Sequence, residues 1–135
     1  MTQIIYSSVP FGFDEAILGG VLMDARRCNT RDGLSGALLC RRDVYLQFLE
    51  GSPTAVETAF ARIRRDDRHL EVTMRASRSV PDRMFGTWAM LHDPAKSWMW
   101  SPAEISDGIL DRASADDLWA LFERLAVNSR TEGPD

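Results

Sequence analysis

Cysteine is scarce in this sequence, and long hydrophobic runs are missing. Only Cys28 and Cys40 occur among its 135 residues, without the spacing of metal ligands or of a disulfide framework. No apolar run reaches the roughly 20 residues that a membrane span needs. The start, Met1 to Gln3, has neither the basic region nor the cleavage site of a signal peptide. We therefore expect a soluble protein of the reduced cytoplasm, without a metal site.

Basic residues do not gather into a stripe. The formal net charge is −4, and the densest basic run, Arg62 to Arg68, is interrupted by Asp66 and Asp67. Proteins that bind nucleic acid usually carry a basic patch or stripe, so this class is disfavoured. The P-loop, the dinucleotide-binding glycine fingerprint and the hydrolase nucleophile elbow are also absent. The sequence predicts a protein that is not an enzyme.

The remaining composition is that of one globular domain, with 44% hydrophobic and 27% charged residues. Helical apolar spacing predicts helices from Asp14 to Asn29 and from Ser52-Pro53 onward. Alternating or continuous apolar runs predict strands at 3–9, 34–40, 44–50, 71–77 and 85–91. This β-α-β-β-α-β-β order is typical of an α+β, ferredoxin-like sheet with two helices on one face and one extra strand.

The character of the chain changes after Leu91. Ser101 and Glu104 form one capping box, and the pair Ser114 and Asp117 predicts a second helix start. The second helix carries an apolar stripe, and we expect the polar tail from residue 128 onward to be frayed. The sequence therefore predicts a core over residues 1–92 and a C-terminal helical extension over 93–135.

Three polar side chains fall at positions that should face the core. Asn29 lies seven positions after Leu22 on the apolar helix stripe, Gln47 lies mid-strand, and Tyr6 shares a strand face with Ser8. An unpaired buried amide costs roughly 1–3 kcal/mol, so such residues need partners. Ordinary explanations stay open: a helix cap for Asn29, a half-exposed position for Gln47 and core packing for Tyr6.

Two further pairs have ordinary interpretations from the pattern alone. Trp88 and Met90 lie at period two on the last predicted strand, which is typical of packing. Arg68 and His69 follow the second helix, where a solvated turn is the default. Neither pair by itself indicates a function.

Five segments together resemble BLUF domains, the blue-light sensors that use FAD. They are Ile5 to Ser8, Arg27 to Leu39, Tyr45 to Gly51, Arg64 to His69 and Phe85 to Met90. They occur in the order and spacing of that family, and the resemblance covers residues 3 to 92.

The resemblance implies roles for the three buried polar residues. Tyr6 would donate an electron and a proton to the excited flavin, and Gln47 would lie between that phenol and the ring. Asn29 would hold the ring's carbonyl and imide edge, because an amide offers both a donor and an acceptor. The ring would lie between the two helices and the sheet.

The resemblance also implies roles for five other residues. Ser8, Arg68 and His69 would belong to the cofactor site, the last two near the second flavin carbonyl or the phosphate side. Trp88 and Met90 would lie on the strand that transmits the signal.

The chain departs from the family pattern at two positions. Many members have asparagine or histidine where this chain has Cys28, and some have serine where it has Ala25. A thiol is a weak donor, so one hydrogen bond to the ring would be missing or would come from water. A serine that could have held the Trp88 indole is absent, which leaves the position of that tryptophan open.

The resemblance predicts a blue-light photoreceptor that binds FAD non-covalently, with FMN and riboflavin as alternatives. Its output would pass to a separate partner, a cyclic-dinucleotide enzyme or a transcription regulator, without direct contact to nucleic acid or membrane. We expect a homo-oligomer, through an exposed sheet or the last helix. The alternative is a light-insensitive flavin- or ligand-binding module of the same fold. A flavin-dependent reductase is disfavoured because no nicotinamide site is recognisable.

Overall fold

The computed structural model describes all residues except 11–14, 42–43, 67–68, 87–89, 94–107 and 133–135. For residues 10, 15–17, 40–41, 69, 91–93 and 128–132 only the backbone is described. The elements in chain order are β1 Thr2–Pro10, α1 Glu15–Asp32, β2 Ser35–Arg41, β3 Val44–Gly51, α2 Pro53–Arg64, β4 His69–Ser79, β5 Leu91–Asp93, α4 Ile109–Arg112 and α5 Ala115–Glu132.

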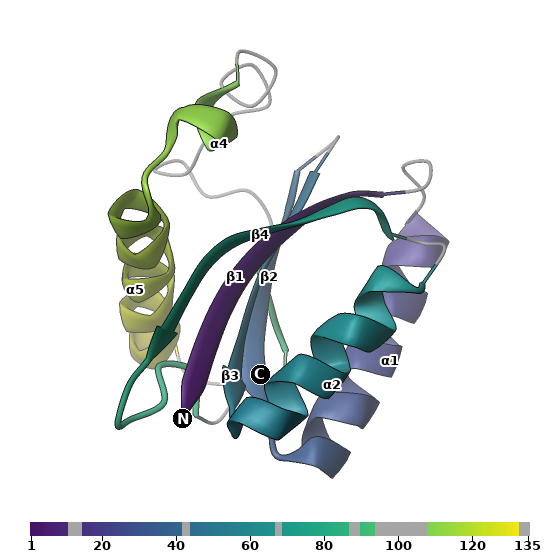
Figure 1. Ribbon diagram of the computed structural model, residues 1–135, viewed down its shortest axis with the longest axis horizontal. Coiled ribbons are helices and arrows are strands. Elements are labelled where there is room, and N and C mark those ends of the chain that lie inside the picture. The colour runs from purple at the N-terminus through teal and green to yellow at the C-terminus, as the bar shows by residue number, and fades with distance from the viewer. Residues whose placement is uncertain (11–14, 42–43, 67–68, 87–89, 94–107, 133–135) are drawn as a thin grey trace.

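The five strands form one sheet in the order β4-β1-β3-β2-β5 (Figure 1). β1 pairs antiparallel with both β3 and β4, and β2 pairs antiparallel with β3 and parallel with β5. The first strand therefore lies between two later ones, as a split β-α-β arrangement requires. This topology confirms the predicted α+β, ferredoxin-like fold.

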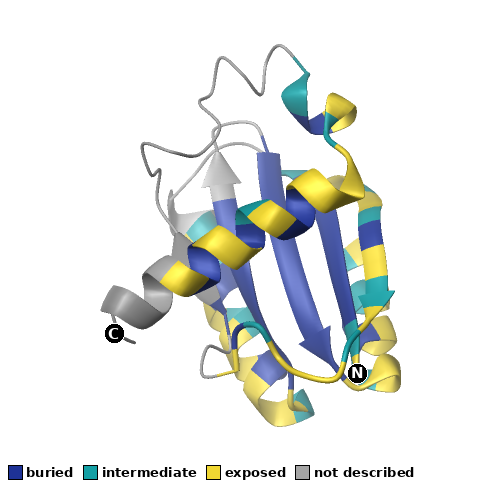
Figure 2. Cartoon of the chain, turned by 90° about the vertical axis from the view of Figure 1, so that its left-hand side faces the viewer, coloured by how far each residue is buried: buried dark blue, intermediate teal, exposed yellow. Residues whose placement is uncertain are grey.

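Helices cover both faces of the sheet. α1 and α2 lie on one face and α5 lies on the other (Figure 1), and Figure 2 shows α5 crossing strands whose residues are buried. Because successive strand residues point to opposite faces, β3 supplies both cores: Tyr45 and Leu49 face α1 and α2, while Leu46 and Phe48 face α5. All eight residues of β3 are buried, which explains its nearly unbroken apolar sequence.

The helix ends follow the signals in the sequence. Ser52 caps α2 by accepting the Ala55 N–H at 3.3 Å, with proline in the first helical turn. Gly33 follows the last residue of α1 with a left-handed φ of 71°, and the Leu34 N–H donates to the Asn29 carbonyl at 2.8 Å. This is a Schellman motif, and it extends α1 three residues beyond the predicted end.

The α5 start is a reciprocal capping box. Asp117 N–H donates to Ser114 Oγ at 3.1 Å, and Ser114 N–H donates to Asp117 Oδ2 at 3.0 Å. The other predicted helix start, Ser101 with Glu104, lies outside the described residues. The tail from residue 128, which the sequence predicts to be frayed, has a helical backbone as far as Glu132. Among the helices that the structure describes, none is long and apolar enough to span a bilayer.

The predicted fifth strand was wrong in its extent. Phe85 and Gly86 form a bend and a turn, and β5 begins only at Leu91. The backbone N–H groups of Met84 and Phe85 donate to the side chain of Glu50, at 2.6 Å each, rather than to a strand. A period-two pattern cannot reveal this competing acceptor.

Candidate functional site

Tyr6 and Gln47 face each other across two central strands. They are direct partners in the antiparallel register of β1 and β3, and the Tyr6 hydroxyl donates to Gln47 Oε1. The two residues are 0% and 3% exposed, and the Phe60 ring meets the phenol edge-on at a centroid distance of 5.2 Å. The half-exposed position considered for Gln47 is therefore wrong, and the phenol is joined to an amide away from bulk water.

Burial controls the ionisation of this phenol. Desolvation raises the pKa of Tyr6 well above its ordinary value of 10.0, and the positive charge of Arg62 offsets this only in part. Tyr6 is therefore neutral at physiological pH. Its proton is fixed in a hydrogen bond whose acceptor is the side-chain carbonyl of Gln47.

A cavity of about 120 Å³ adjoins this pair. Asn29 and Cys28 of α1, Gln47 of β3 and Met90 contribute to its lining, together with Ile63 of α2. Asn29 is 1% exposed and Met90 is 3% exposed. The structure thus brings Asn29, Gln47 and Met90 into one cavity, with Tyr6 one hydrogen bond away.

The end of α1 fixes the position of Asn29. Its backbone carbonyl accepts the Schellman hydrogen bond from Leu34, and its side chain lines the cavity. The ordinary explanation, a residue at a helix cap, holds for the backbone. The amide itself is buried at the wall of the cavity, and it carries both a donor and an acceptor.

A link between α1 and the Met90 segment was missed from the sequence. Arg26 Nε donates to the Met90 carbonyl at 3.1 Å. An exposed arginine on a helix gives no signal in the sequence for such a contact, because the acceptor is a backbone group 64 positions away. The bond ties one wall of the cavity to the segment that precedes β5.

The rim of the cavity is charged. Arg62 lies there, 3.8 Å from Asp32, and Arg27 and Asp66 also contribute. A hydrogen bond from Arg31 is the main reason why the pKa of the Asp32 carboxyl is lowered. A ligand with a ring in the cavity and a charged tail would therefore meet side chains of both signs, since Asp24 and Asp66 line the cavity together with Arg27 and Arg62.

The remaining predicted site residues are less fully placed. Ser8 is buried on β1 two residues after Tyr6, but it does not line the described part of the cavity. His69 begins β4, where its backbone pairs with Pro10, and its side chain is not described. Arg68 and Trp88 lie outside the described residues.

The polar groups that line the cavity match a flavin, but the cavity of about 120 Å³ is small for one. A flavin imide edge presents an N–H between two carbonyls, and the amides of Asn29 and Gln47 offer matching donors and acceptors. Ligand pockets usually measure about 300–1,000 Å³, so a tricyclic ring requires the side chains between α1 and α2 to separate. No cluster of metal ligands occurs among the residues that the structure describes.

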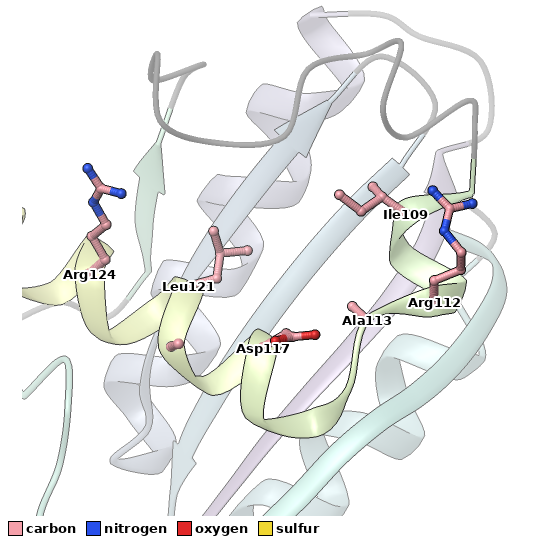
Figure 3. A pocket seen from close by; sticks show the side chains of 7 residues that line it. Ile109, Arg112, Ala113, Asp117, Leu121 and Arg124 are labelled. Atoms are coloured by element: carbon pink, nitrogen blue, oxygen red, sulfur yellow. The ribbon is translucent and has the colours of Figure 1, made fainter.

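A larger hollow lies on the opposite side of the sheet. It measures about 460 Å³ and runs between α4 and α5 (Figure 3). Ile109 and Leu121 provide apolar surface, and Arg112 and Arg124 stand at its border. It contains none of the predicted site residues, whereas the smaller cavity contains three.

A family model described as "Sensors of blue-light using FAD" matches residues 1–91. Among curated proteins, the beta subunit of photoactivated adenylate cyclase from Euglena gracilis is 32% identical over 68 residues, which cover 50% of this chain and 8% of that protein. The Euglena longa beta subunit is 27% identical over 107 residues, covering 79% of this chain and 12% of that protein. The chain therefore spans about a tenth of these relatives.

Solved structures with the same fold cover most of the chain. The dark-state structure of BlrB, a BLUF protein, superposes with a TM-score of 0.77 at 24% identity and covers 94% of this chain and 96% of BlrB. Klebsiella pneumoniae BlrP1 with FMN and cyclic diGMP superposes with a TM-score of 0.64 at 27% identity, covering 82% of this chain and 28% of BlrP1. The BlrB likeness concerns the fold alone.

Proposed function

The chain belongs to the BLUF family of blue-light sensors that use FAD, and we propose that it senses light through a flavin held beside Tyr6 and Gln47. The observation that carries the proposal is the buried hydrogen bond from the Tyr6 hydroxyl to Gln47, at the edge of a cavity lined by Asn29 and Met90. A phenol, an amide bridge and an amide anchor are the groups that such a sensor requires.

The chemistry begins with the proton of Tyr6. When bound, the flavin supplies blue-light absorption and, in its excited state, a strong oxidant. A buried neutral phenol loses an electron most easily if its proton leaves at the same time, because an isolated buried charge is costly. Gln47 Oε1 accepts a hydrogen bond from the Tyr6 hydroxyl in the dark, so an acceptor for the proton is in place before excitation.

The stored signal is a changed hydrogen bond at Gln47. Gln47 would store the signal if its side-chain amide ended the cycle rotated or in another tautomer, because its donor and acceptor would then have changed places beside the flavin. Met90 lines the same cavity and is tied to α1 through Arg26. The altered amide therefore acts on the segment that leads into β5, a local switch that biases a larger element.

The ligand and partner follow from the relatives. FAD is the flavin in the family's description, and FMN is the alternative, since the BlrP1 structure was solved with FMN. The curated relatives are photoactivated adenylate cyclases of which this chain spans about a tenth. The chain itself would not be an enzyme, and its output would pass to a nucleotide cyclase, a cyclic-dinucleotide enzyme or a transcription regulator.

Two variants test the assignment of roles. Tyr6→Phe and Gln47→Leu should retain bound flavin but lose the reversible red shift of the flavin spectrum under blue light. Tyr45→Phe is the matched control, because it removes a hydroxyl from a tyrosine buried in the same core cluster and should keep the shift. A normal photocycle in Tyr6→Phe would refute the roles of the phenol and the amide.

The small cavity favours a second candidate, a light-insensitive module of the same fold. Purified protein that stays colourless after incubation with FAD and with FMN would support this candidate. Bound flavin with an unchanging spectrum under blue light would support it as well.

A further inference from the structure

Glu50 is a buried carboxylate that the light site does not use. It is 0% exposed and follows Gln47 by three positions on β3, so it points to the opposite face of the sheet. Its Oε1 accepts from Gln3 Nε2 at 2.9 Å and from the Met84 N–H at 2.6 Å. Its Oε2 accepts from Ser35 Oγ at 2.8 Å and from the Phe85 N–H at 2.6 Å.

Only a carboxylate suits this position. All four contacts are donated to Glu50, and an ionised carboxylate is a pure acceptor with two equivalent oxygens. Two of the donors are backbone N–H groups, which cannot turn round to accept. A buried charge is tolerated only when it is hydrogen-bonded in this way. Glu50 therefore fixes the chain at Met84 and Phe85, six and five residues before Met90.

One branch of this network reaches the end of α1. Arg83 donates through Nη1 to Ser35 Oγ at 3.0 Å and to the Glu50 backbone carbonyl at 3.4 Å. Its Nη2 donates to the carbonyl of Gly33 at 2.6 Å. Gly33 belongs to the cap that positions Asn29. Arg83 therefore connects the segment before Met90 to the end of α1 that carries Asn29.

A second branch reaches α5. Gln3, which donates to Glu50, accepts from Arg78 Nε at 2.8 Å. The Arg78 guanidinium lies 4.0 Å from the centre of the Trp119 ring and 3.8 Å from Glu123, both on α5. The amide of Gln3 is thereby oriented, with its oxygen toward the cation and its NH₂ toward the carboxylate.

We propose that Glu50 is a positioning residue that couples the segment leading to Met90 with the C-terminal helix α5. The coupling runs from the N–H groups of Met84 and Phe85 through Glu50 and Gln3 to Arg78. It rests on the proposed function only in the statement that Met90 responds to light. The coupling itself exists in the dark and can be measured there.

Glu50→Gln is the sharpest test because it keeps the shape and changes one oxygen to NH₂. An NH₂ group at Oε1 would face the Met84 N–H, and at Oε2 it would face the Phe85 N–H. Loss of one of these two bonds should speed amide hydrogen exchange about tenfold at residues 84–86 and also at 115–127. The dark flavin spectrum and the light-induced shift should remain.

Two further variants separate the branches. Ser35→Ala removes one donor to the carboxylate but leaves the backbone contacts and Gln3, so exchange at 115–127 should stay as in the wild type. Arg78→Met keeps an apolar contact with Trp119 and removes the guanidinium. It should speed exchange at 115–127 and abolish any light-induced change there, while the spectral shift persists.

The outcomes distinguish this inference from the proposed function. Faster exchange at 84–86 alone in Glu50→Gln, with α5 as protected as in the wild type, would overturn the coupling. If Glu50→Gln does not fold, Arg78→Met provides the test. Unchanged protection of α5 in that variant, or a light-induced change of exchange in α5 that persists, would overturn the proposed coupling. If the spectrum of the wild-type protein does not change under light, the proposed photoreceptor function is contradicted. The coupling in the dark is still tested by hydrogen exchange in the same variants.

Discussion

Tyr6 holds its proton more firmly than an exposed tyrosine does. Its side chain is fully buried, and desolvation raises its pKa more than the charge of Arg62 lowers it. The phenol is therefore a proton donor whose acceptor is Gln47. A light-driven transfer that moved the electron alone would leave a buried charge without compensation.

This ionisation behaviour predicts how stability depends on pH. The unfolded phenol releases its proton near pH 10.0, whereas folded Tyr6 keeps it. The stabilisation is therefore fully present below pH 10.0 and is lost as the pH rises toward the folded pKa. Urea unfolding at increasing alkaline pH should show the wild type losing stability more steeply than Tyr6→Phe. Equal pH slopes, or a phenolate band from Tyr6 with an ordinary midpoint, would contradict the burial of this proton.

Single residues differ in how far the sequence could reveal them. Tyr6, Asn29 and Gln47 stood out because they are polar side chains at positions that should face the core, and the family resemblance assigned their roles. Glu50 and Arg26 could not be found in this way, since their partners include backbone groups in a distant segment. The sequence shows side-chain patterns but not which backbone groups lack a strand partner.

The elements follow local signals closely where their caps are local. Ser52 and Ser114 begin their helices as the sequence predicts, and Gly33 ends α1. The predicted strand over 85–91 was wrong in its extent because a distant carboxylate takes the N–H groups of Met84 and Phe85. Element boundaries are therefore predictable where the competing partner lies within a few residues.

Two glycines of the α1 region should respond oppositely to alanine. Gly33→Ala places a side chain at a φ of 71°, so it should cost about 1–2 kcal/mol. Gly19 lies inside the helix, and a Cβ there would meet nothing within 4 Å, so Gly19→Ala should stabilise by about 0.5–1 kcal/mol. Urea unfolding of both variants measures the difference. A Gly33→Ala variant as stable as the wild type would argue against the left-handed cap.

At the scale of the whole molecule, the central strands β1, β2 and β3 are buried from both sides, whereas the edge strand β4 is largely exposed. Two aromatic residues of α5 pack on the sheet side of this core. The ring centroid of Phe122 lies 5.4 Å from that of Phe48 and 6.3 Å from that of Phe85. The ring centroid of Trp119 lies 6.1 Å from that of Phe48. The extension thus shares a core with β3, on the face opposite the cavity. The sequence predicted the apolar stripe of α5 but not the face that it covers, because both faces of β3 are apolar.

Shortening Phe122 tests this packing. Phe122 is 0% exposed, and Phe122→Ala should cost about 3–5 kcal/mol through lost burial and the cavity left behind. Val127→Ala on the same helix is the control, since Val127 is 55% exposed and should change stability by no more than about 0.5 kcal/mol. Denaturant unfolding compares the two. Similar small losses in both variants would mean that α5 does not pack on the sheet.

The central claim is that a flavin lies beside the phenol of Tyr6, within reach of the Gln47 amide. The light-minus-dark absorption spectrum of the purified, flavin-loaded protein tests it most directly. A red shift that forms under blue light and reverses in the dark is the predicted result. A flavin-loaded protein whose spectrum bleaches without shifting, or does not change at all, would contradict it.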